Sequence, residues 1–266
     1  MPSRIWRSLW VLLSFLTALA PAMPAHASAS ILVWPVDPVI EHDQQAVALW
    51  LENRGSEPSL LQVRILAWKQ VDGEDRYADQ DDVVGTPPMI RIEAGKRQMV
   101  RLTRTVSVGP GEERAFRVLI DEVPTHRASA DGRAPVEGNT PAIGVRFQFR
   151  YSIPLFVYGE GLWWKPRADR DRNPTAAGQP ELSWRRVVRE GKPELEILNA
   201  GPIHARLTGV YVTHGTSSTT LAEGLLGYVL AGSSLRRPVP DVIAADAVLM
   251  ATVNGSPEAR TITSVR

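Results

Sequence analysis

The sequence predicts an all-β protein made of antiparallel β-sandwiches, and three observations support this prediction. Residues 144–158 alternate between large apolar and polar side chains, which is the period-2 pattern of a strand with one buried face. The 21 prolines and 20 glycines separate short apolar runs along the whole chain. No window of the sequence shows a sustained 3.6-residue period, so we expect no amphipathic helix.

The first 27 residues have the features of a secretory signal peptide. Arg4 and Arg7 precede an apolar run at residues 9–20, and Ala27 completes an A-x-A cleavage site. The run is too short to span a bilayer comfortably, which disfavours an uncleaved anchor. Cleavage after Ala29 is the alternative position. We therefore expect an exported, periplasmic protein that does not insert into the membrane.

The composition of the remaining chain excludes several classes of function. Loss of Arg4 and Arg7 changes the formal charge from +1 to −1, so electrostatics do not favour binding to nucleic acid or an anionic membrane. The absence of cysteine excludes disulfides and thiolate chemistry. The histidines lie far apart in sequence, which favours ordinary surface histidines over a zinc site. No nucleophile elbow, P-loop or dinucleotide-binding pattern is present, so we expect neither an enzyme nor a cofactor.

Residues 28–158 form the first predicted domain. It contains seven strand-like segments separated by turn signals, which is the number of strands in an immunoglobulin-like sandwich. Between two of these segments, residues 70–82 are polar and acidic and are predicted to form a solvated loop. Residues 124–144 are a polar segment of the kind that stays mobile until a partner binds. The predicted strands are residues 31–34, 46–52, 60–68, 88–92, 98–103, 115–121 and 144–158.

Residues 159–266 form the second predicted domain. The boundary follows from a change in composition, because Arg, Asp, Pro and Gly crowd together at residues 165–180. A hairpin turn is predicted at residues 190–193. Strand-like segments at residues 183–189, 194–198, 205–213, 225–230, 247–253 and 259–265 predict a second small sandwich.

The last strand of the first domain carries the main functional prediction. At about 3.3 Å per residue it would be about 45 Å long, well beyond the usual strand. One face presents an apolar row, and a row of this kind on an exposed edge suggests a partner. The alternative is a central strand whose apolar row is ordinary core. The row consists of Val145, Phe147, Phe149, Tyr151 and Ile153.

An ordered set of short motifs spans nearly the whole exported chain. Through these motifs the sequence resembles the periplasmic chaperones of the chaperone–usher pathway, a boomerang-shaped, two-sandwich family related to PapD, and most of all its archaic branch. The motifs are TPPMIRIEAG at 86–95, MVRL at 99–102, FRVLIDEVP at 116–124, YSIPLF at 151–156, LNAGP at 198–202, HARL at 204–207 and GYVL at 227–230.

The resemblance implies a mechanism for the last strand. Pilin subunits of such pathways resemble immunoglobulin folds without their final strand, and the chaperone lends its own long strand to complete them, which is β-strand addition. The implied partners are pilin subunits and an outer-membrane usher, and no nucleotide is needed. Whether the free chaperone self-associates to hide its edge is left open.

One departure from the family affects the expected anchor for the subunit's C-terminal carboxylate. The better-known branch uses a basic pair, but the corresponding stretches at residues 36–39 and 153–155 contain no base. Arg117 and Arg150 are the replacements that we consider, and they would be neighbours if their strands pair. Arginine suits a carboxylate because its guanidinium offers a bidentate fork. The alternative for each is a solvated surface charge.

A periplasmic carbohydrate-binding or adhesive module is the competing hypothesis. Such a module needs an exposed aromatic platform, and Trp163 and Trp164 are the obvious candidates in the sequence. Because they lie beside the predicted linker, we interpret them as packing between the domains.

Overall fold

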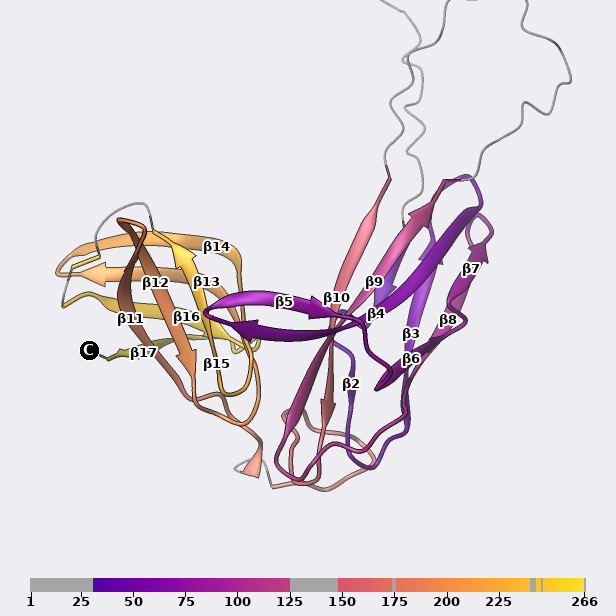
Figure 1. The fold of residues 1–266 in the computed structure, drawn as a ribbon, viewed down its shortest axis with the longest axis horizontal. Helices are drawn as coiled ribbons and strands as arrows, with labels where there is room; N and C mark the ends of the chain where they lie inside the picture. The colour runs from indigo at the N-terminus through magenta and orange to yellow at the C-terminus, as the bar shows by residue number, and fades with distance from the viewer. Residues whose placement is uncertain (1–30, 125–147, 174–175, 240–242, 245, 266) are drawn as a thin grey trace, which may run out of the picture.

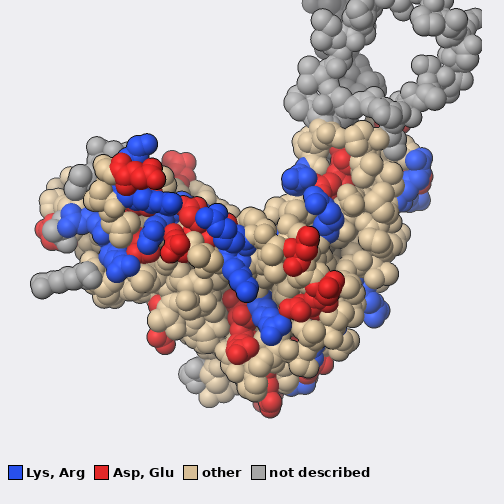
Figure 2. Space-filling view, in the orientation of Figure 1, with Lys and Arg blue, Asp and Glu red and all other residues tan. Residues whose placement is uncertain are grey.

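The computed structural model describes residues 31–124, 148–173, 176–239, 243–244 and 246–265, and every named element in them is a β-strand. Figure 1 shows two β domains that meet at an angle, and the space-filling view shows a hollow between them (Figure 2). The predicted all-β, two-domain architecture is therefore confirmed. Strands of the first domain end at Tyr158 and those of the second begin at Leu182. The boundary after residue 158 stays a prediction.

The first domain is a sandwich of two sheets whose apolar faces meet. Alternate residues of the facing strands, such as Leu49, Leu102, Val118 and Leu155, are fully buried between the sheets. One sheet has the order β1 (Ile31–Trp34), β3 (Ala46–Asn53), β8 (Arg97–Arg104) and β6 (Val83–Thr86). The other has the order β2 (Val39–Ile40), β10 (Arg150–Tyr158), β9 (Glu113–Val123), β4 (Ser59–Val71) and β5 (Glu74–Ala78), with β7 (Met89–Ile92) also paired to β4.

The solvated loop predicted at residues 70–82 is wrong, because most of it forms a hairpin. β4 continues to Val71, and β5 returns antiparallel to it. Asp72 and Gly73 connect the two strands with φ values of 53° and 75°. A two-residue turn with both φ values positive favours Asp-Gly, so the turn signal was present in the sequence but was outweighed by the polar composition of the segment.

Two further differences concern short or displaced strands of the first domain. β2 and β6 were not predicted, because two to four residues are too few for a periodic pattern to be distinguished. The predicted strand at 144–158 begins only at Arg150. Gln148 and Phe149 precede the strand, and residues 144–147 lie outside the described part of the chain.

The second domain is built from one path of seven strands. β15 and the first half of β14 were missed because their sequences are largely polar. The core contains Trp184, Leu195, Leu207 and Leu249, all nearly inaccessible to solvent. The order is β14 (Ser217–Val229), β13 (Ala205–His214), β16 (Val248–Val253), β17 (Ala259–Ser264), β11 (Leu182–Arg189), β12 (Lys192–Asn199) and β15 (Ser233–Pro238).

Aromatic packing and a buried contact between Glu113 and His204 join the two domains. His204 of the second domain stacks on Phe156 of β10 with ring centroids 3.5 Å apart. The carboxylate of Glu113 in β9 accepts the backbone N–H of His204 and lies 2.7 Å from its Nδ1. His204 is only 3% exposed, so the predicted surface role is wrong for this histidine. The cluster at the joint consists of Trp68, Phe156, Tyr158, Leu162, Ile203, Tyr228 and Leu230.

Candidate functional site

β10 is an edge strand over most of its length. It pairs with β9 from Arg150 to Tyr158, whereas β2 pairs with its other edge only at Phe156 and Val157. From Arg150 to Leu155 this second edge therefore has no strand partner among the described residues. A strand edge of this kind can accept another chain through main-chain hydrogen bonds.

The apolar row of β10 passes from solvent into the domain core. Phe149 is 42% exposed, Tyr151 is half-buried, and Ile153 lies in the core with Leu155 and Val157. The hydroxyl of Tyr151 accepts the backbone N–H of Ile31 at 3.2 Å, which ties β10 to β1. Ile153 therefore belongs to the core, as the alternative interpretation expected, whereas a partner for the exposed Phe149 stays a prediction. The predicted members Val145 and Phe147 lie outside the described residues.

Arg150 is already engaged by an acid on the neighbouring strand. It lies directly opposite Asp121 in the β9–β10 register, and its guanidinium contacts the Asp121 carboxylate. Arg64 of β4 donates to the same carboxylate at 2.7 Å. Burial alone would raise the pKa of Asp121, but the two arginines outweigh burial and hold the pKa below its usual value.

Arg117 lies in the cleft between the domains and has no acidic partner among the residues that the structure describes. Its Cζ is 3.8 Å from the ring centroid of Trp68 and 5.2 Å from that of Tyr228. Its Nε is buried without a hydrogen-bond partner, and no carboxylate of the described residues lies within 4.0 Å of its guanidinium. The cleft thus holds an unpaired planar cation between aromatic rings.

The expectation that Arg117 and Arg150 are neighbours is wrong. Arg117 lies opposite Pro154, whereas Arg150 lies opposite Asp121. Both side chains are on the outward face of the sheet, but four positions separate them along the strand, which is about 13 Å. The two guanidiniums also have different neighbours, because Arg150 contacts Asp121 whereas Arg117 packs against Trp68.

Three residues of the cleft were missed in the sequence. Trp68 and Tyr228 flank Arg117 but are indistinguishable in sequence from core aromatics of strands. Lys165 of the linker forms an ion pair with Asp37, in the stretch where the family's first base is missing. That pairing requires two segments more than a hundred residues apart, so no local pattern predicts it.

The two linker tryptophans do not form a free platform. Trp164 packs against the aromatic cluster of the joint, as predicted, and Lys165 Nζ lies 4.1 Å from the centroid of its ring. The guanidinium of Arg172 lies 5.1 Å from the centroid of the Trp163 ring.

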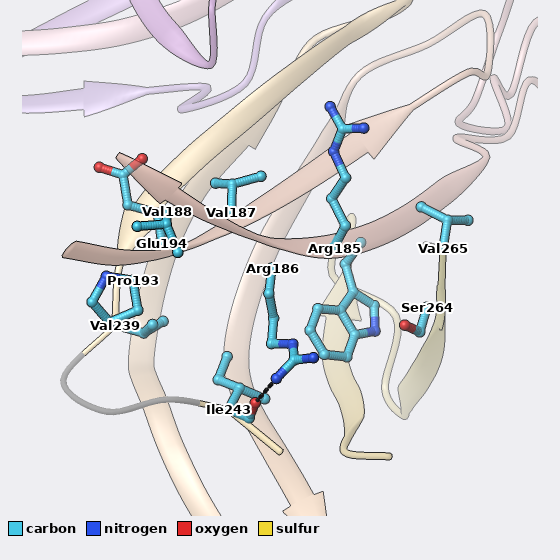
Figure 3. Close-up of a pocket in the computed structure, with 11 residues that line it drawn as sticks. Arg185, Arg186, Val187, Val188, Pro193, Glu194, Val239, Ile243, Ser264 and Val265 are labelled. Atoms are coloured by element: carbon cyan, nitrogen blue, oxygen red, sulfur yellow. Dashed lines mark hydrogen bonds between the residues drawn. The ribbon is translucent and has the colours of Figure 1, made fainter. Parts of the chain in front are cut away.

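A cavity of about 660 Å³ lies in the second domain, beside the hairpin of β11 and β12 (Figure 3). Arg186 crosses it and donates to the carbonyl of Ile243 at 2.7 Å. None of the residues predicted to bind a partner lines it. In the part of the chain that the structure describes, no group of acids, histidines or cysteines is arranged to hold a metal ion. Among the same residues, no helix is long and apolar enough to cross a bilayer.

Comparison with known proteins places this geometry in context. Residues 36–162 match the family model for the N-terminal domain of PapD, described as a pili and flagellar-assembly chaperone. The probable fimbrial chaperone YadV of Escherichia coli K12 is 27% identical over 198 residues, covering 72% of this chain and 71% of YadV.

Solved structures extend the similarity to both domains. A chain in the CsuC–CsuE chaperone–tip adhesion subunit complex, from the archaic chaperone–usher Csu pili of Acinetobacter baumannii, is 31% identical. The match covers 90% of this chain and 100% of that chain, with a TM-score of 0.71. The complex of SafA pilin with the SafB chaperone of Salmonella enterica, at 19% identity and a TM-score of 0.56, shows the same fold over 90% of this chain and 97% of that chain.

Proposed function

Because this chain belongs to the PapD-like chaperones of the chaperone–usher pilus pathway, we propose that it captures pilin or adhesin subunits by donating β10. Members of this family are periplasmic and non-enzymatic. Delivery of the captured subunit to an outer-membrane usher completes the proposed role. Residues 1–27 are proposed to be removed on export, and N-terminal sequencing of the mature protein would distinguish cleavage after Ala27 from cleavage after Ala29.

The unpartnered edge of β10 is the observation that supports this proposal most strongly. An incomplete immunoglobulin fold can continue its sheet along Arg150–Leu155 through main-chain hydrogen bonds. The exposed end of the apolar row then fills the subunit's open core. Each aromatic side chain buried in this way removes about 150–250 Å² from water, which stabilises the complex by a few kcal/mol.

The members of the apolar row have different proposed roles. Val145, Phe147, Phe149 and Tyr151 are proposed to contact the subunit directly. Ile153, which is buried in the chaperone's own core, holds the base of the donated strand in place.

Arg117 is the proposed anchor for the subunit's C-terminal carboxylate. Its guanidinium is in the cleft, unpaired by any described acid, and planar, so it can bind a carboxylate through two parallel hydrogen bonds. Arg150 is the weaker candidate, because binding a new carboxylate would require it to leave Asp121.

The test is a double substitution, Phe147→Ser with Phe149→Ser, in the mature chain co-expressed in a periplasm with a pilin encoded beside its own gene. We expect normal export and thermal stability, but at least about a 100-fold loss of apparent affinity for the pilin. Val188→Ser is the matched control, because Val188 is a 75% exposed apolar residue on the second domain. Co-purification at normal yield would exclude strand donation by this row, and unfolding would assign the row to the core.

A further inference from the structure

The Arg117 guanidinium is held by aromatic side chains that come from both domains. Trp68 belongs to β4 of the first domain, and Tyr228 belongs to β14 of the second. We infer that Trp68 and Tyr228 are positioning residues for Arg117, so that the carboxylate anchor exists only when the two domains are docked. This inference rests on the proposed function, because the anchored group is the subunit's C-terminal carboxylate.

The geometry explains why Arg117 needs such support. A free arginine side chain has many rotamers, and ordering it on binding costs entropy. Aromatic rings against the faces of a guanidinium restrict its orientation and attract its charge, while the N–H groups at its edge remain available for a carboxylate. Tyr77, opposite Trp68 in the β4–β5 register, adds a hydroxyl that interacts with Arg117.

Both aromatic residues are fixed by the β4–β5 hairpin. The indole Nε1–H of Trp68 donates to Asp75 Oδ1 at 2.9 Å, and Gln70 donates to the same oxygen at 2.9 Å. Gln70 also donates to the carbonyl of Tyr228 at 2.8 Å and accepts the N–H of Leu230 at 2.9 Å. Figure 1 shows the hairpin reaching across from the first domain to the second. One glutamine therefore links the two sides of the Arg117 site.

The ring of Tyr228 faces the Arg117 guanidinium, with Arg117 Cζ 5.2 Å from the ring centroid. Arg206 lies directly opposite Tyr228 on β13, and the charges of both Arg206 and Arg117 act on the Tyr228 hydroxyl. Removal of the ring and removal of the hydroxyl can be separated experimentally. Tyr228→Leu removes the aromatic face, whereas Tyr228→Phe keeps the aromatic face and removes only the hydroxyl.

The experiment is a double-mutant cycle on affinity for the co-expressed pilin, using the full mature chain. We expect Tyr228→Leu to weaken binding by about 3- to 30-fold, and Tyr228→Phe to recover most of this loss. In an Arg117→Ala background, Tyr228→Leu should add almost nothing, because its effect passes through Arg117. Tyr211→Leu, which removes a tyrosine of β13 that is not part of the cluster at the joint, is the control and should not change affinity.

Each outcome of the cycle decides a separate point. Additive losses from Tyr228→Leu and Arg117→Ala would overturn the positioning role and leave the Arg117 anchor standing. No loss of pilin affinity in Arg117→Ala would overturn both the anchor and its positioning. Strand donation would be unaffected by that result, because the Phe147→Ser, Phe149→Ser double substitution tests it separately.

An NMR measurement on the free chaperone tests whether Trp68 and Tyr228 position Arg117 when no partner is bound. The Arg117 Nε–H signal, identified by its disappearance in Arg117→Ala, should be displaced by ring currents in the wild type and in Tyr228→Phe. It should move toward an ordinary arginine position in Tyr228→Leu. An ordinary position in the folded wild type would overturn the inference even if Tyr228→Leu fails to fold.

Discussion

At the scale of single residues, Asp121 shows how charge holds β10 in register with its neighbours. Its carboxylate is shared by Arg150, the first residue of β10, and by Arg64 of β4. The three side chains join three neighbouring strands on the outward face of one sheet. Because Arg150 begins the strand next to the exposed Phe149, this ion-pair cluster fixes the end of β10 that is proposed to meet a subunit.

Asp121→Asn should destabilise the protein in a way that depends on pH. The folded-state pKa of Asp121 is below its ordinary value of about 3.9, so its carboxylate contributes stability above about pH 4. That contribution is lost as pH falls through the folded pKa. The difference in melting temperature between wild type and Asp121→Asn should therefore be present at pH 7 and shrink below about pH 4.

Glu93→Gln provides the comparison for this measurement. Glu93 pairs with Arg91, and both side chains are more than half exposed, so a small effect on the melting temperature is expected. If the Asp121→Asn difference were the same at pH 3 and pH 7, the cluster would contribute nothing through its charge.

At the scale of the element, β10 combines two kinds of strand. It follows the exposed Phe149, and from Arg150 to Leu155 one of its edges has no strand partner among the described residues, yet its apolar side chains Ile153, Leu155 and Val157 lie in the core. The opposite face of the same strand supplies Phe156 and Tyr158 to the joint between the domains. The strand that we propose is donated is thus fixed at its other end by packing on both faces.

Substitutions at the buried Ile153 and at the exposed Phe149 should separate the effect on folding from the effect on binding. Ile153→Ala removes buried methylene groups and should lower the free energy of unfolding by about 2–4 kcal/mol. Phe149→Ser should change it by less than about 1 kcal/mol while weakening pilin capture. Urea unfolding followed by tryptophan fluorescence measures the first effect, and co-purification measures the second. Equal destabilisation by both changes would show that Phe149 is part of the core.

At the scale of the whole molecule, several independent contacts hold the two domains together. Glu113 and His204 meet at the centre of the joint, and Arg172 of the linker binds Glu41 of the first domain. The β4–β5 hairpin adds a third connection, because the carbonyl of Gly73 accepts the N–H of Arg236 at 2.9 Å. Cleft residues from the two domains are therefore kept in a fixed relation before any partner binds.

Gly73→Ala should weaken the contact between the hairpin and the second domain. The effect should be larger than that of placing an alanine at a positive φ, because the added Cβ also collides with Arg236. A Cβ at Gly73 would lie 2.3 Å from Cγ of Arg236, so the hairpin or β15 must move. Gly191→Ala is the matched control, because Gly191 has the same φ of 75° in a hairpin turn but no atom within 4 Å of the added Cβ. We expect a lower melting temperature and a wider angle between the domains, measured by small-angle X-ray scattering, for Gly73→Ala alone. Equal effects of the two substitutions would show that only strain matters.

The sequence by itself determined the properties that depend on neighbours along the chain. Alternation with period 2 predicted an all-β fold, the core strands of both domains and the apolar row that ends in Ile153, because successive side chains of a strand must point to opposite faces. The missing basic pair also indicated Arg117 and Arg150 as candidate anchors for a subunit's C-terminal carboxylate. β5 was missed because the polar composition of its segment outweighed the Asp-Gly turn signal, and β6 was missed because four residues are too few for a periodic pattern to be distinguished.

Only the tertiary structure decided which of these residues are exposed and which are buried or paired. Burial and pairing depend on which strands lie side by side, and these strands come from distant parts of the sequence. Arg117 and Tyr228 are more than a hundred positions apart, yet their side chains are in contact, whereas Arg117 and Arg150 occupy paired strands without being neighbours. The same apolar row is open at Phe149 and closed at Ile153 because the opposing sheet covers only part of β10. Local periodicity is the same at both positions, so the difference arises from long-range packing.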